Sequence, residues 1–137
     1  MNMADEKYFD LEIISPERTF YKGQVHFLEL TTSEGEVGIY ANHIPMTNVV
    51  VPGIVTIHEA DGVKEAALHS GFMVILQDSV KIMAEVAEWP DEIDENRANE
   101  AKIRAERRLK EGGDGIDYVR AEAALKRSIA RLNLLGK

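Results

Sequence analysis

The chain has 137 residues, of which 45% are hydrophobic and 29% charged, and its formal net charge is −8. This composition is sufficient for one domain, or one domain with a small appendage, around a buried core. The negative charge argues against nucleic-acid binding, which needs positive groups against phosphates, and against direct docking on an anionic membrane. The absence of cysteine excludes disulfides and thiol chemistry. No apolar run approaches the about 20 residues that a spanning helix needs, so we expect membrane association only through a partner.

The charge is divided unevenly along the chain. Residues 1–90 carry 14 acidic and 5 basic side chains, a net charge of −9, whereas residues 91–137 carry 10 acidic and 11 basic ones, a net charge of +1. Two regions of different charge indicate two structural units. We place the boundary between residues 1–89 and residues 90–137.

The first unit is predicted to consist of short strands. Alternating apolar and polar residues predict a strand over 9–13, which ends at Ser15-Pro16. A turn-rich segment is expected over 33–38 and a hairpin turn at Asp61-Gly62. Turn signals also stand at Ser70-Gly71. The further strands expected from the pattern cover residues 25–31, 49–51, 54–58, 63–68, 72–76 and 80–85. Short strands with frequent turns predict an antiparallel β-sandwich or barrel.

From Trp89-Pro90 onward the residues are mostly strong helix formers. Proline is tolerated in a first helical turn, and the acidic residues Asp91, Glu92 and Asp94 complement the positive end of a helix dipole. We therefore expect the first helix to begin at Pro90 and to end near Lys110. Trp89 is expected to pack at the junction between the two units.

Glycines separate this helix from a second one. Gly112, Gly113 and Gly115 end the first helix and form a predicted hinge. Asp114 or Asp117 can cap the second helix, which runs to about residue 135. The predicted fold class is therefore α+β, an N-terminal antiparallel β-sandwich or barrel followed by a C-terminal two-helix hairpin.

Each predicted helix carries an apolar stripe and an arginine stripe at helical spacing. The apolar stripes are Ala98, Ala101, Ala105 and Leu109, and then Tyr118, Ala121, Leu125, Ile129 and Leu132. The arginine stripes are Arg97, Arg104 and Arg108, and then Arg120, Arg127 and Arg131. Guanidinium groups match phosphate geometry and keep their charge, so two facing stripes would bind a polyanion. The alternative is that both stripes are solvated faces with ion pairs such as Glu100–Arg104.

The first apolar stripe is shallow because it is mostly alanine. Each methyl-sized contact contributes less than about 1 kcal/mol, so closed and opened forms of the hairpin would differ by little free energy. A ligand that bridges both helices would then select the closed form.

No catalytic or metal-binding signature stands out. We find no serine–histidine–aspartate order, paired-carboxylate motif or recurring metal-ligand spacing. His26, His58 and His69 stand apart in strand-like contexts. We therefore predict neither catalysis nor a metal site in this chain.

Three segments together resemble the epsilon subunit family of bacterial F-type ATP synthases over essentially the whole chain. Residues 35–46, GEVGIYANHIPM, look like a family loop that ends in His-x-Pro, with Asn42 able to take the left-handed conformation of a glycine. Residues 70–74 and 80–85 look like the family's late strand pair. Residues 93–98, IDENRA, match the family's ATP-binding pattern Ile/Leu-Asp-x-x-Arg-Ala at every fixed position.

The resemblance implies a non-catalytic rotor subunit of a proton-transporting ATP synthase. Its β-domain would dock on the gamma subunit and the membrane c-ring, with a contact loop that includes Glu34, Gly35, Glu36 and His43. The hairpin would fold against the β-domain, or extend toward the alpha and beta subunits and block hydrolysis. The complex would lie at the cytoplasmic face of the bacterial plasma membrane, as a peripheral assembly.

The resemblance also implies that ATP is a regulatory ligand, with the requirement for Mg²⁺ left unassigned, and that it holds the folded form. The contacts transferred by the motif are Ile93, Asp94, Arg97, Ala98, Arg104, Arg127 and Arg131, with Glu88 as a weaker candidate. An ionised Asp94 accepts hydrogen bonds, which suits the adenine amino group or the ribose hydroxyls. The alternative function is a free-standing ATP-sensing module, which needs no stalk partner.

Overall fold

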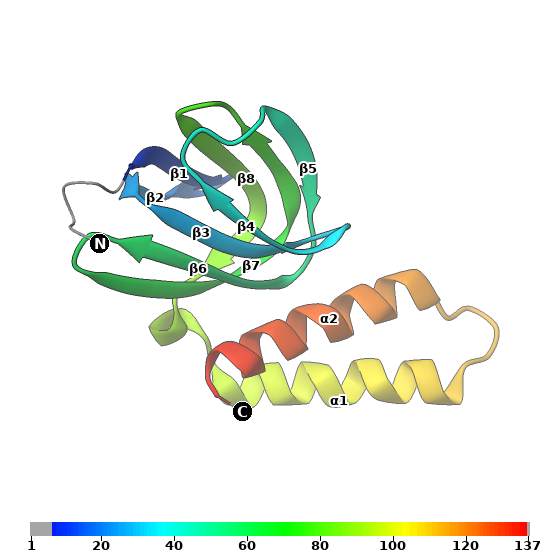
Figure 1. The fold of residues 1–137 in the computed structure, drawn as a ribbon. Helices are drawn as coiled ribbons and strands as arrows, with labels where there is room; N and C mark the ends of the chain where they lie inside the picture. The colour runs from blue at the N-terminus through cyan, green and yellow to red at the C-terminus, as the bar shows by residue number, and fades with distance from the viewer. Residues whose placement is uncertain (1–6, 137) are drawn as a thin grey trace.

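The computed structural model describes residues 7–136 and arranges them as a β-sandwich followed by a helical hairpin (Figure 1). The first six residues of the predicted β-domain and Lys137 of the predicted hairpin lie outside the described residues. The strands are β1 (Phe9–Ser15), β2 (Arg18–Val25), β3 (Phe27–Thr32), β4 (Gly35–Tyr40), β5 (Met46–Val50), β6 (Gly53–Glu59), β7 (Gly62–Ile75) and β8 (Ser79–Glu88). The helices are the short 3₁₀ helix η2 (Pro90–Glu92), α1 (Glu95–Glu111) and α2 (Tyr118–Leu134).

The long strand β7 links the two layers of the sandwich. Its first part pairs with β6 and its last part with β5, while β8 runs along its other edge. The strand order is β2-β1-β8-β7-β5-β3-β4, and β6 joins β3 to β7. Only the β1–β8 pair is parallel among the strands described. The predicted fold class, a sandwich followed by a two-helix hairpin, is confirmed.

Strand alternation builds the core, as β1 illustrates. Phe9, Leu11 and Ile13 are buried on one face, while Asp10 points to solvent from the other. At the edge of this core Trp89 stacks on the ring of Phe20 with centroids 4.3 Å apart. Trp89 therefore packs at the junction, as the sequence predicted.

Of two turn predictions in the β-domain, one is right only in part and the other is wrong. Of residues 33–38, only Ser33-Glu34 turns, because Gly35 and its successors pair along β3 as strand β4. Ser70-Gly71 does not end a strand, because β7 continues pairing with β8 on both sides of it. The sequence reading also omitted β2, whose residues 18–25 lack a regular alternation and form a strand by pairing with β1.

The first α-helix begins at Glu95 and not at Pro90. Asp94 is extended, and its Oδ1 accepts the backbone N–H of Arg97 at 3.1 Å, which caps α1. Pro90 instead starts the separate 3₁₀ turn η2. Of the two residues predicted to cap α2, Asp117 does so through the N–H of Arg120, 3.0 Å away.

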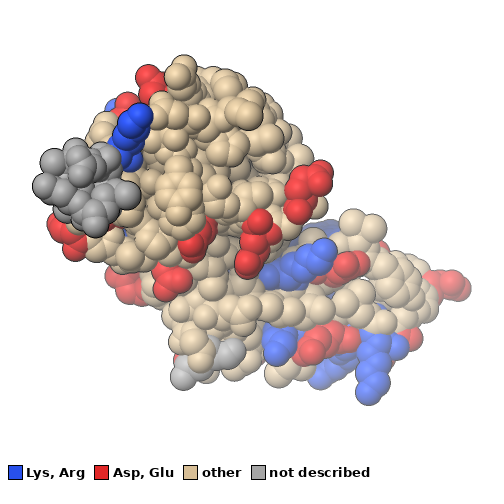
Figure 2. All heavy atoms as spheres, in the orientation of Figure 1, with Lys and Arg blue, Asp and Glu red and all other residues tan. Residues whose placement is uncertain are grey.

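The prediction for the apolar face was correct for α1 and partly wrong for α2. Ala98 and Ala105 of α1 are buried, but Tyr118 and Ile129 of α2 are 49% and 38% exposed. The buried residues of α2 are Ala121, Ser128, Ala130 and Leu132. The reason is that α2 lies between α1 and strands β6 and β7, so it buries two sides rather than one stripe (Figure 1). Figure 2 shows Lys and Arg interspersed with Asp and Glu on the outward side of the hairpin.

Gly71 allows the close approach of β7 and β8. A Cβ atom at Gly71 would lie 2.0 Å from the carbonyl oxygen of Met83 and 2.9 Å from the Cα of Ala84. We expect Gly71→Ala to lower the free energy of unfolding by about 3 kcal/mol, because backbone atoms must move apart. Urea denaturation measures this change.

The matched control for this prediction is Gly62→Ala in the same strand. A Cβ at Gly62 has nothing within 4 Å. This variant is expected to unfold within about 0.5 kcal/mol of the parent. Equal stability of the two variants would contradict the role given to Gly71.

Candidate functional site

A cavity of about 390 Å³ lies where the start of α1 meets the end of β8 and the last turns of α2. This volume is within the range of small-molecule sites, about 300–1,000 Å³. Its lining residues are Glu88, Glu92, Ile93, Asp94, Arg97, Ala98, Glu100, Ala101, Arg104 and Arg131. Because these residues come from both helices and the sandwich, the cavity exists only while the hairpin is folded against the sandwich.

Seven of the eight residues predicted to contact ATP line this cavity. Arg127 is the exception, since it lies one turn before Arg131 on α2 and is not part of the lining. Arg108 and Arg120 line a separate hollow at the tip of the hairpin. The two arginine stripes were expected to face one site along their whole length. The structure gathers only Arg97, Arg104 and Arg131 at this cavity, so the expectation holds for these three arginines and not for the rest.

Two of the three cavity arginines have no acidic partner in the part of the chain that the structure describes. Among residues 7–136 neither Arg97 nor Arg104 forms an ion pair with its guanidinium group. The Glu100–Arg104 pair of the alternative interpretation is likewise not formed within this part of the chain. Two unpaired guanidinium groups in one hollow favour an anionic ligand.

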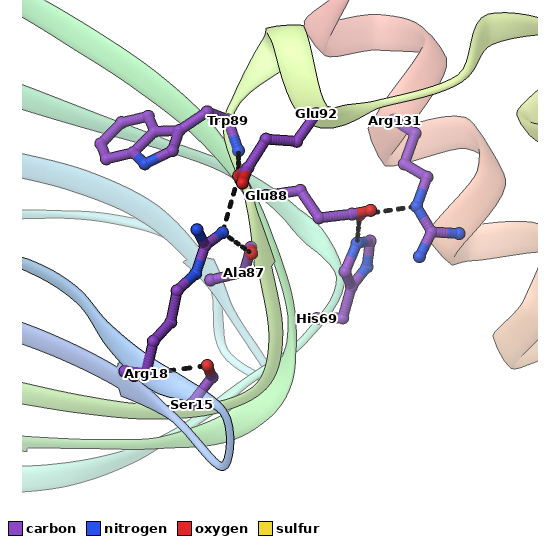
Figure 3. Close-up of polar contacts among 8 residues, drawn as sticks. All are labelled: Ser15, Arg18, His69, Ala87, Glu88, Trp89, Glu92 and Arg131. Atoms are coloured by element: carbon purple, nitrogen blue, oxygen red, sulfur yellow. Dashed lines mark hydrogen bonds and ion pairs between the residues drawn. The ribbon is translucent and has the colours of Figure 1, made fainter.

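The third cavity arginine is held by a carboxylate that also binds a buried histidine (Figure 3). Oε1 of Glu88 accepts Nε–H of Arg131 at 2.7 Å and lies 3.0 Å from Nε2 of His69. Burial alone would raise the pKa of Glu88, but the hydrogen bonds from His69 and Arg131 outweigh burial and leave this pKa below its ordinary value. The contact joins β7, β8 and α2 at one atom.

A second polar cluster fixes the turn that leads into the cavity. Arg18 donates to Oε1 of Glu92 at 2.7 Å, and the same oxygen accepts the backbone N–H of Trp89 at 2.9 Å (Figure 3). The hydrogen bond from Arg18 lowers the pKa of Glu92. Together with the stacking of Trp89 on Phe20, these contacts hold η2 against β2.

Sequence reasoning did not assign His69 or Arg18 to this region. Arg18 lies in β2, the strand that the sequence reading omitted, and its contact with Glu92 spans 74 residues of sequence. The only sequence signal for His69 is its place in a strand-like segment. That place indicates a buried side chain but does not identify its hydrogen-bond partner. Both contacts join residues that are far apart in the sequence, so no local sequence pattern predicts them.

The residues of the predicted contact loop do not form one cluster. Glu34 lies in the turn before β4, and Gly35 and Glu36 begin that strand, whereas His43 follows its far end. They are therefore placed at opposite ends of β4. Asn42 has φ of 64°, which confirms the left-handed conformation expected for it.

The predicted hinge forms the loop between the helices. Gly112, Gly113 and Gly115 have φ values of 61°, 110° and 86°, a region that favours glycine. The N–H of Gly113 also donates to the hydroxyl of Tyr118 at 3.2 Å. The glycines thus end α1 and reverse the chain direction.

Family models match nearly the whole described chain. The model described as ATP synthase, Delta/Epsilon chain, beta-sandwich domain matches residues 8–90, and the long alpha-helix domain of the same chain matches residues 91–136. The chain belongs to the ATP synthase delta/epsilon chain family. The family resemblance found in the sequence is confirmed.

Relatives of the same family support this assignment at the level of sequence. The ATP synthase epsilon chain of Caldanaerobacter subterraneus subsp. tengcongensis is 42% identical over 133 residues, which covers 96% of each chain. That of Ruminiclostridium cellulolyticum is 39% identical, over 94% of this chain and 96% of its own. Family membership makes this chain a non-catalytic stalk subunit of an ATP synthase.

Solved structures of low sequence identity share the fold of this family member. A chain in the mitochondrial ATP synthase of Euglena gracilis (OSCP/F1/c-ring, rotational state 1) has a TM-score of 0.82 at 20% identity, and the match covers 95% of this chain and 82% of that one. A chain from the central stalk and c-ring of the Tetrahymena thermophila enzyme has a TM-score of 0.58 at 14% identity. Among residues 7–136, no helix combines the length and hydropathy needed to cross a membrane.

The lowered pKa of Glu88 predicts a pH dependence of stability. A carboxylate with a depressed folded-state pKa stabilises the protein above its unfolded pKa of about 4.3, and this contribution is lost as the pH falls through the folded-state value. We expect Glu88→Gln to be less stable by about 1 kcal/mol at neutral pH, with the difference disappearing as the pH falls below about 4. Urea denaturation of both proteins from pH 3 to 7 measures this difference.

Glu100→Gln is the matched control, because Glu100 lines the same cavity without an ion pair to a described residue. Its stability should follow that of the parent throughout this pH range. A constant offset between the parent and Glu88→Gln would show that the carboxylate charge is not the stabilising feature.

Proposed function

We propose that the cavity at the base of the hairpin binds ATP and that the chain regulates ATP hydrolysis by its synthase through this ligand. The observation that carries the proposal is the gathering of Arg97, Arg104 and Arg131 around the matched segment 93–98. Two of these guanidinium groups have no ion-pair partner in the described chain, which leaves them available to a triphosphate.

The remaining lining residues suit the nucleoside part of the ligand. Ile93 and Ala98 offer apolar contact to a base, and Asp94 uses only Oδ1 for the helix cap. The other oxygen of Asp94 is free of that bond and can accept from the adenine amino group or a ribose hydroxyl. Glu88 and Arg131 would close the site from the sandwich and from α2.

Binding of this kind would stabilise the folded hairpin. Arg97 and Arg104 belong to α1 and Arg131 to α2, so one triphosphate can reach all three only in the closed form. A ligand shifts a conformational equilibrium only through its different affinity for the two forms. The helices meet through small side chains such as Ala98 and Ala105, so the closed and opened hairpins differ by little free energy. Binding of ATP would shift this balance toward the closed form.

The partners within the synthase are part of the same proposal. We infer docking of the sandwich on the gamma subunit and the c-ring, and contact of the extended hairpin with the alpha and beta subunits. An apolar row across the sandwich supports a protein partner, since the half-buried Ile14 and the exposed Met83, Phe72 and Val49 are neighbours on successive strands. Phe72 is 56% exposed. Such a patch is typical of protein interfaces.

The location proposed for the chain follows from these partners. It would be held at the cytoplasmic face of the bacterial membrane through the synthase and not by its own contact with lipid. On the side shown in Figure 2, basic and acidic side chains are mixed on the hairpin, so this side is not the continuous basic face of a nucleic-acid binder. Co-purification with the gamma subunit distinguishes this role from a free-standing ATP sensor.

Removal of a cavity arginine tests the ATP site. We expect Arg97→Ala to weaken ATP binding tenfold or more, about 1.4 kcal/mol, because a guanidinium contact to the triphosphate is lost. Arg127→Ala is expected to have a similar effect, with Arg127 joining the site once ATP has bound. Isothermal titration calorimetry on the isolated chain measures the affinity, and a distance probe between α1 and α2 reports hairpin closure.

Arg107→Ala serves as the control, because Arg107 is exposed on α1 and does not line the cavity. Its affinity for ATP should equal that of the parent. Unchanged affinity in both Arg97→Ala and Arg127→Ala would remove the site assignment, while the family membership would stand.

A further inference from the structure

His69 is completely buried in β7 and is not part of the cavity lining. Its side chain is 0% exposed, and its Nε2 lies 3.0 Å from Oε1 of Glu88. Its other ring nitrogen, Nδ1, is also buried and has no hydrogen-bond partner within residues 7–136. The contacts of this imidazole therefore point to one neighbour, Glu88.

The bonding pattern decides which nitrogen carries the proton. An ionised carboxylate only accepts hydrogen bonds, so Nε2 of His69 carries a proton in the bond to Glu88. Nδ1 has no partner among the described residues, and a buried polar atom without a partner costs stability relative to an apolar side chain of similar size. A leucine would fill the space without this cost, so the histidine is explained by its bond to Glu88.

That bond determines how Glu88 meets the rest of the site. Oε1 of Glu88 is shared between His69 from β7 and Arg131 from α2, as Figure 3 shows. These are the titratable groups that hydrogen-bond to this carboxylate from the elements packed on it. No hydrogen bond within residues 7–136 involves Oε2 of Glu88, which leaves that oxygen available at the cavity wall.

We propose that His69 is a positioning residue for the ligand cavity. By donating from Nε2, it holds the Glu88 carboxylate in the orientation that keeps Arg131 at the cavity wall before any ligand arrives. The same bond ties α2 to the sandwich through Glu88. The inference rests on the proposed ATP site for its consequence in binding, but the positioning itself is a property of the folded chain.

Two substitutions of similar size separate hydrogen bonding from space filling. His69→Gln places an amide nitrogen near the position of Nε2, whereas His69→Asn places it near Nδ1, too short to reach Glu88. His69→Leu keeps the volume and removes both nitrogens. His26→Leu is the control for loss of a histidine, because His26 packs against the rings of Tyr8 and His58 rather than near Glu88.

The first measurement is made on the full chain without nucleotide. Carbon-detected NMR titration follows the carboxyl group of Glu88, and nitrogen-edited NMR follows Nε–H of Arg131. We expect His69→Asn and His69→Leu to raise the pKa of Glu88 and to speed hydrogen exchange at Arg131, because the carboxylate loses a donor and its fixed orientation. His69→Gln and His26→Leu should resemble the parent.

The second measurement is the dissociation constant of ATP by calorimetry. It should rise about tenfold in His69→Asn and His69→Leu and stay within about twofold of the parent in His69→Gln, as expected for a lost hydrogen bond to a charged group. Thermal unfolding identifies variants that fail to fold. If His69→Leu is one of them, the comparison of His69→Gln with His69→Asn still tests the positioning role.

Each outcome bears on a separate statement. An unchanged titration of Glu88 in His69→Asn, or equal behaviour of the Gln and Asn variants, would overturn the positioning role. A parent chain that binds no ATP would remove the proposed function, while the NMR comparison would still decide whether His69 positions Glu88 and Arg131.

Discussion

The ion pair between Glu88 and Arg131 is the contact on which the arrangement of the two units depends. It joins the last residue of β8 to the last turn of α2, and the buried His69 completes it from β7. Losing one member of a partly buried pair leaves the other without compensation, so the pair acts as a unit. The helix interface itself is shallow, since its buried residues on α1 are the alanines Ala98 and Ala105. The Glu88–Arg131 contact therefore adds a polar tie to the apolar packing of α2 on β6 and β7.

The junction between the units is fixed by different means. Trp89 stacks on Phe20, and Glu92 is bound by Arg18 and by the backbone of Trp89, so the turn η2 belongs structurally to the sandwich. Ile93 and Asp94 are extended, and α1 starts directly after them. Segment 93–98, which carries the family's ATP-binding pattern, thus begins directly after η2. In the proposed function, a ligand bound at this point would act on the direction in which the hairpin leaves the sandwich.

Judged by the described residues, the cavity combines arginines with and without an ion-pair partner, and this difference matters for its chemistry. Arg97 and Arg104 have no ion-pair partner within the described chain, and their charges repel one another across a shared hollow. Arg131 already donates to Glu88, but through Nε alone. An anion entering the cavity would therefore gain most of its new ion pairs from the arginines of α1. Arg131 of α2 is already held at the cavity by its contact with the Glu88 carboxylate. Such pre-organisation lowers the cost of binding.

The sequence alone determined the features that depend on local patterns. Apolar and β-branched runs between turn signals predicted most strands, and helix formers and glycines predicted the hairpin. The segment 93–98 marked the family and four of the ten residues that line the cavity. Tertiary structure decided what depends on distant neighbours. Pairing with β1 created β2, packing on two sides set which residues of α2 are buried, and the fold brought His69, Glu88 and Arg131 together. Periodicity reports which face of an element is apolar, whereas partners many residues apart are chosen only when the elements pack.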